Sequence, residues 1–152
     1  MKHLSRHLAR FRALRRADQR TLLAAAAWLP MFWLGLRLLG LARFQARLQR
    51  KAVIRGESMT LAQIRALGAL VNIAARHTPF PATCLTRSLL LGWLLHRRGV
   101  ASQLRIGVRL ANGALDAHAW VECDGVPVND EPDVGTHFAS FGDLVPLKAF
   151  DA

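Results

Sequence analysis

The chain has 152 residues, of which 52% are hydrophobic, and a formal net charge of +11. This length suits one domain, and the apolar fraction is sufficient for a hydrophobic core. Two cysteines and a basic N-terminus without a cleavable apolar segment argue against a secreted, disulfide-stabilised protein. We therefore expect a protein of a reducing compartment, the cytoplasm.

The charge is divided unevenly along the chain. Residues 1–115 hold 20 Lys and Arg against 2 Asp and Glu, whereas residues 116–152 hold 1 against 8. This asymmetry predicts an acidic partner or an anionic membrane surface for the N-terminal part. The cations are scattered along apolar helices without an aromatic groove or a binding motif beside them, so we expect no nucleic-acid partner.

The first 56 residues are predicted to form a helical, basic and apolar region. Residues 1–20 have apolar side chains at helical spacing, which indicates an amphipathic helix with either a solvated face or a surface for a membrane or partner. Residues 22–36 carry no charge. A membrane span needs about 20 apolar residues. Pro30 and Arg37 interrupt the stretch, so a buried helical hairpin or a partner-binding surface is favoured over a span, with helix continuing over residues 41–55.

Residues 57–152 are predicted to form the core. Ser58 or Thr60 can cap a helix over residues 61–75, and a proline-bearing loop follows. Thr83 is a good N-cap for the next helix and places Cys84 at its first position, and arginines followed by Gly99 end that helix.

Cys84 has two interpretations at this stage. The positive end of a helix dipole stabilises a thiolate, and cysteine hydrolases build their nucleophile in this way. Alternatively, Cys84 is a small buried hydrophobe.

After the helix that ends before Gly99, apolar residues recur at every second position, which is the spacing of a β-strand. Residues 104–110 alternate, Asn112-Gly113 is a hairpin signal, and residues 115–123 alternate again. Asp124-Gly125 turns the chain once more, and residues 126–130 are predicted to form a third strand. Helices followed by an antiparallel sheet indicate an α+β fold.

His118 lies on the second predicted strand between two alanines, and its role is either structural or functional. If residues 123–125 form a three-residue loop, His118 pairs with Asp130, whose carboxylate can hold an imidazole nitrogen. A two-residue turn would place Glu131 opposite His118. Cys–His–Asp chemistry favours the three-residue loop.

Five motifs together carry a family resemblance: PATCLTRSL at 81–89, RRG at 97–99, LRIGV at 104–108, AHAWVE at 117–122, and DG at 124–125 through ND at 129–130. They resemble the transglutaminase-like cysteine peptidases of lasso-peptide biosynthesis, and more narrowly the separately encoded protease half of the lasso B protein. The resemblance implies a papain-like core, in which a nucleophile-bearing helix packs on an antiparallel sheet.

By this resemblance Cys84 is the nucleophile, His118 the general base and acid, and Asp130 the residue that orients the histidine. The implied activity removes the leader from a ribosomally made precursor peptide. Implied partners are a small leader-binding companion protein and the separate cyclase that closes the ring. A nucleotide requirement is ascribed to some members, but no glycine-rich phosphate loop is present, so no cofactor is expected.

Other hypotheses stay open. One is a peptide amidase or acyltransferase on the same fold, because fold does not fix the reaction. Another is a non-catalytic scaffold associated with a membrane through its N-terminal helices. A zinc site of Cys84, His118 and Cys123 lacks a supporting spacing, so no metal is predicted. Cys123 is expected to be buried and inert, and Gln63 is a candidate second oxyanion donor.

Overall fold

The computed structural model describes residues 11–50 and 58–140. Its elements are α2 (Arg16–Gln49), α3 (Leu61–His77), α4 (Cys84–Arg97), β1 (Gln103–Ala111), β2 (Ala114–Cys123), β3 (Val126–Pro127), α5 (Val134–His137) and β4 (Ala139–Ser140). The predicted α+β class, with helices first and an antiparallel sheet after them, is confirmed. Three predictions fall outside the described residues: the first half of the 1–20 helix, the helix over 51–55, and the division between residues 56 and 57.

The long helix α2 folds back on itself at Gly40. Gly40 has φ 72° and ψ 169°, a conformation that glycine adopts at little cost because it has no Cβ. Past this break, Phe44 returns to Phe32, with their ring centroids 5.2 Å apart, whereas an unbroken helix would separate the two residues by about 18 Å. Residues 22–36 are therefore one continuous arm of a helical hairpin whose turn lies beyond them, at Gly40, and burial is partial, because Ala25, Leu29 and Phe32 are the buried residues of α2.

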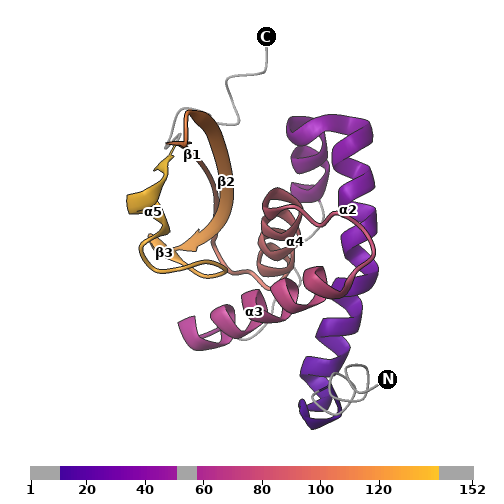
Figure 1. Cartoon of the computed structure of the whole chain (residues 1–152). Coiled ribbons are helices and arrows are strands. Elements are labelled where there is room, and N and C mark those ends of the chain that lie inside the picture. Colours follow the sequence, from indigo (N-terminus) through magenta and orange to yellow (C-terminus); the bar gives the residue numbers. More distant parts are fainter. Residues whose placement is uncertain (1–10, 51–57, 141–152) are drawn as a thin grey trace, which may run out of the picture.

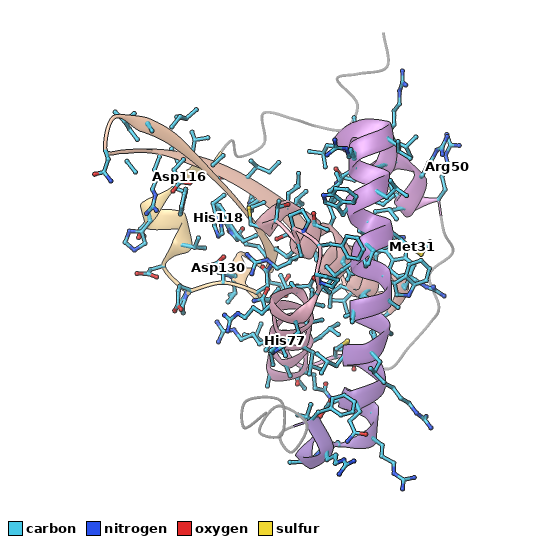
Figure 2. The ribbon with its side chains drawn as sticks, turned by 45° about the vertical axis from the view of Figure 1, so that its right-hand side comes forward. Met31, Arg50, His77, Asp116, His118 and Asp130 are labelled. Carbon is cyan, nitrogen blue, oxygen red and sulfur yellow. The ribbon has the colours of Figure 1, made fainter. Side chains whose placement is uncertain are left out.

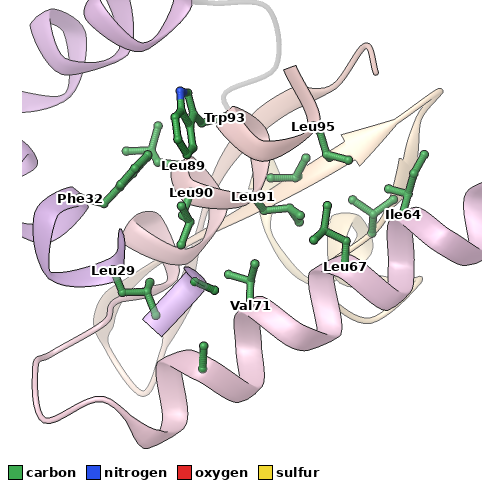
Figure 3. Packing of buried hydrophobic residues seen from close by; sticks show 14 of the residues in the cluster. Leu29, Phe32, Ile64, Leu67, Val71, Leu89, Leu90, Leu91, Trp93 and Leu95 are labelled. Atoms are coloured by element: carbon green, nitrogen blue, oxygen red, sulfur yellow. The ribbon is translucent and has the colours of Figure 1, made fainter. Parts of the chain in front are cut away.

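The main hydrophobic core joins the three long helices to one face of the sheet. Figure 1 shows α4 between α2 and the sheet, with α3 crossing beside them. Buried residues of this core include Leu29, Phe32, Ile64, Leu67, Val71, Leu89, Leu90, Leu91, Trp93 and Leu95, which Figure 3 labels, together with Val121 and Cys123 of β2. The central position of α4 follows from its apolar side chains, which leave few positions for solvent.

The sheet has the strand order β3-β2-β1-β4. The predicted Asn112-Gly113 turn is confirmed, since β1 ends at Ala111, β2 begins at Ala114, and both turn residues have positive φ. Positive φ at both central residues defines the type I′ turn that suits a two-residue hairpin.

The predicted register between β2 and β3 is wrong. Cys123 pairs with Val126, so Asp124-Gly125 forms a two-residue turn with φ values of 50° and 76° instead of part of a three-residue loop. The predicted strand over residues 126–130 is also too long, because β3 ends at Pro127. Val128 still donates its N–H to the backbone oxygen of Val121 at 2.9 Å, but Val121 N–H donates to the side chain of Asn129, so the ladder ends there.

Candidate active site

Cys84 is the first residue of α4, as the sequence predicts. Thr83 is the N-cap, and its side-chain oxygen accepts the backbone N–H of Thr86 at 3.3 Å. Cys84 is partly exposed. The first N–H groups of a helix have no partner within the helix, and the helix dipole adds positive potential there, so this position can stabilise an oxyanion.

His118 and Asp130 form a hydrogen-bonded pair. His118 Nε2 lies 2.5 Å from Asp130 Oδ2, and about a quarter or less of each side chain is exposed. An ionised carboxylate only accepts hydrogen bonds, so Nε2 carries the proton and Nδ1 is left for chemistry. Figure 2 shows the two labelled side chains side by side between the sheet and the loop after β3.

Two aromatic rings flank His118. The ring of Phe138 lies 5.0 Å from the imidazole centroid, and that of Trp120 is stacked at 6.2 Å. Trp120 and Phe138 belong to a second, smaller buried cluster with Val134 on this face of the sheet. The segment formed by α5 and β4 supplies Phe138, and the sequence pattern gave no sign of it because both elements are short.

Ser88 connects the start of α4 to the histidine strand. Its hydroxyl, which is fully buried, donates a 3.0 Å hydrogen bond to the carbonyl oxygen of Ala119, the neighbour of His118. Cys84 lies one helical turn before Ser88 on the same side of α4. The thiol and the imidazole therefore come from adjoining parts of two packed elements. No hydrogen bond joins Cys84 to His118 in this structure.

The remaining candidates have other environments. Cys123 is buried on the opposite face of β2 from His118, and burial, followed by the nearby Asp124, raises the pKa of its thiol. Gln63 is not placed as an oxyanion donor for Cys84, because it lines a cleft with Arg98 at the C-terminal end of α4, whereas Cys84 begins that helix. Its side-chain oxygen accepts the N–H of Thr60 in the capping box of α3. Within residues 11–50 and 58–140, no group of three or more His, Cys, Asp or Glu side chains could hold a metal ion.

A separate cleft of about 390 Å³ runs along α4 from Ser88 to His96. Gln49 of α2, Trp93 and His96 of α4, and Gln103 of β1 are among the residues that line it. Cys84, His118 and Asp130 do not border this cleft, so it is distinct from the site formed by these three residues.

Comparison with known proteins gives one match. The model of the transglutaminase-like superfamily matches residues 26–142, which is more than half of the chain and includes every residue of the site described above. No curated protein and no solved structure matches the chain. The superfamily includes cysteine peptidases and transferases. This match, over a chain that has a cysteine at a helix start and a histidine on β2 bonded to an aspartate in the loop after β3, shows that the chain belongs to the transglutaminase-like superfamily.

Proposed function

We propose that this protein is a cysteine peptidase that removes the leader from a ribosomally synthesised lasso precursor peptide, in the cytoplasm. The observation that carries the proposal is the His118–Asp130 pair held next to the helix that begins at Cys84. The sequence motifs at 81–89 and 117–122 supply the narrower assignment to leader removal, because they resemble those of the lasso leader peptidases.

In the first half of the reaction, Cys84 Sγ attacks the carbonyl carbon before the scissile bond while the thiol proton passes to His118 Nδ1. Backbone N–H groups at the start of α4 stabilise the oxyanion. The C–N bond then breaks, and His118 donates its proton to the leaving amine. The product of this half is a thioester on Cys84.

In the second half, water attacks the thioester carbon and His118 accepts a proton from that water. The C–S bond breaks, which releases the leader as a carboxylic acid and returns the proton to the thiol. Asp130 keeps the imidazole in the tautomer that both halves need and stabilises it when it is charged.

Mass spectrometry of the products tests this proposal. The protein is incubated with the precursor peptide and the companion protein, with and without ATP and with and without an added amine. We expect a free leader acid that has gained one water. A leader that has gained the amine would indicate an acyltransferase instead, and loss of ammonia from a side-chain amide without chain cleavage would indicate an amidase.

The outer face of α2 supports the proposed companion protein as a partner. Leu23, Met31, Leu34 and Leu38 are 47–72% exposed on this helix. Figure 2 shows the labelled Met31 on the side of α2 that faces away from the sheet. Contiguous exposed apolar side chains on a soluble protein mark interaction sites. We propose that the companion covers this face; contact with the cyclase is a further proposal.

A membrane is the competing occupant of the same face. α2 is long and apolar enough to cross a membrane by length and composition, with an 18-residue window of mean hydropathy 1.7 that is 17% buried. The break at Gly40 and the charge of Arg37 favour a surface for a partner over a span.

We expect the isolated protein to aggregate or bind detergent, and co-expression with the companion to raise its soluble yield. Replacing Met31 and Leu38 with serine should raise the solubility of the isolated chain and weaken its binding to the companion. Flotation with anionic and neutral liposomes, with and without the companion, tests whether the same face binds a membrane. Salt-resistant flotation that the companion does not relieve would show that α2 is a membrane anchor.

A further inference from the structure

The chain leaves the sheet just before Asp130, where the backbone N–H of Val121 bonds to a side chain instead of to the neighbouring strand. Val128 N–H donates to Val121 O at 2.9 Å, and in a continuing antiparallel ladder Val121 N–H would donate back to Val128 O. Instead Val121 N–H donates to the side-chain oxygen Oδ1 of Asn129 at 2.8 Å. Asn129 thus ends the pairing of β2 with β3, and Asp130 is the next residue after that end.

Helix α3 packs closely against this segment through a contact, the seat, formed by Gly68 and Asn72. A Cβ atom built on Gly68 would lie 2.4 Å from the carbonyl oxygen of Val128 and 3.3 Å from the Cα of Asn129, so the close approach requires glycine. One turn later, the side chain of Asn72 donates a 2.9 Å hydrogen bond to the backbone oxygen of Asn129. Arg87 of α4 in turn donates to Asn72 at 3.5 Å.

The same asparagine also reaches the nucleophile helix. Asn129 Nδ2 donates to Ser88 Oγ at 3.0 Å, and Ser88 donates to the carbonyl oxygen of Ala119. Asn129 is therefore bonded to α3 through Asn72, to α4 through Ser88 one turn after Cys84, and to β2 through Val121, while Ser88 carries the connection on to Ala119 beside His118.

We propose that Asn129, seated on α3 at Gly68 and Asn72, is the positioning residue that presents Asp130 to His118 and holds both against the start of α4. The inference rests on the proposed peptidase function and extends it. It assigns no contact with the substrate to Asn129. Its effect passes through the orientation of His118, whose charged form Asp130 stabilises.

Replacing Gly68 with alanine tests the seat. Ordinary contact begins at 3.4 Å, so the new methyl group must displace Val128 by about 1 Å, and a misplacement of that size can lower a rate roughly 100-fold. We expect kcat for leader removal to fall by about that factor with KM little changed. The matched control is Gly92→Ala, also in a helix, where a Cβ meets nothing within 4 Å and kcat should stay at the wild-type value.

Asn129→Asp and Asn129→Ala keep the test independent of folding. The aspartate retains an acceptor for Val121 N–H and loses the donor to Ser88, whereas alanine loses both. We expect kcat to fall in the order wild type, aspartate, alanine. Alkylation of Cys84 by iodoacetamide at about pH 6 should slow in the same order, because a displaced Asp130 stabilises imidazolium less. Near-UV circular dichroism confirms that each variant is folded at the assay temperature.

The two failures are distinguishable. If wild-type Cys84 reacts no faster than its His118→Ala variant and no leader is released, the peptidase proposal fails. If the wild type is active and His118-dependent, but folded Gly68→Ala and Asn129→Ala variants retain wild-type kcat and alkylation rates, the positioning role is overturned.

Discussion

Replacing Cys84 with alanine is expected to lower the rate of leader removal on the order of thousands-fold, because the variant cannot form the thioester. Substrate binding should persist, since alanine removes only the sulfur from a partly exposed position at the helix start. The measurement is the rate of appearance of the free leader acid by mass spectrometry.

The second cysteine supplies a matched control. Cys123→Ala removes a buried sulfur from the opposite face of β2 and should leave the rate of leader removal near wild type, with some loss of thermal stability from the cavity. A Cys84→Ala protein that still releases leader at the wild-type rate would remove the basis of the mechanism, because the cleavage would then not depend on this thiol.

Replacing Asp130 with asparagine is the second large effect. The amide nitrogen of asparagine can donate to His118 Nε2, which places the imidazole proton on Nδ1, where it cannot accept the thiol proton. Neutral asparagine also stabilises imidazolium less than the carboxylate does. A loss on the order of 10³-fold or more in kcat is expected by comparison with other triads.

A second histidine–aspartate pair provides a control for the loss of one negative charge in the Asp130→Asn variant. Asp133 and His137 are 3.1 Å apart, and both side chains are more than half exposed. Exposed pairs contribute little, so Asp133→Asn should leave kcat close to wild type. Equal losses from Asp130→Asn and Asp133→Asn would mean that acidic charge in general, and not the orientation of His118, supports the activity.

Local sequence signals predicted most of the elements. Thr60 and Thr83 cap the two helices that were expected after them, and Asn112-Gly113 forms the expected hairpin turn. A turn was also expected at Asp124-Gly125, but as part of a three-residue loop. These features could be predicted because each depends on side chains within a few residues of one another. Cys84 at a helix start is one of them.

The predicted β2–β3 register is wrong because it rests on the chemistry of a His118–Asp130 pair, which favoured a three-residue loop over the two-residue turn that the structure has. The Asp-Gly signal itself favours a type I′ turn, and the structure has that turn. His118 and Asp130 still meet, because Asp130 lies beyond the strand, where ladder register no longer decides which way a side chain points.

The hydrogen bonds that join α3, α4, β2 and the loop after β3 around the site were not predictable from local sequence patterns. Ser88, Asn129 and Asn72 are bonded across 31 to 57 residues of sequence. One signal was present: glycine inside a helix costs about 1 kcal/mol relative to alanine, so Gly68 in the middle of α3 indicated a close packing contact. The sequence did not indicate which backbone would approach it.

The central claim is that Cys84 is a reactive thiolate maintained by His118, and selective alkylation tests it most directly, without any knowledge of the peptide substrate. Iodoacetamide is added at about pH 6, where an ordinary thiol is almost entirely protonated, and the labelled peptides are mapped. Cys123 serves as the internal reference, since it is 5% exposed and burial raises the pKa of its thiol.

We predict rapid labelling of Cys84 in the wild type, slow labelling of Cys123, and a marked fall in Cys84 labelling when His118 is replaced by alanine. Equal labelling of the two cysteines, or Cys84 labelling that does not change in the His118→Ala variant, would contradict the catalytic role assigned to this pair.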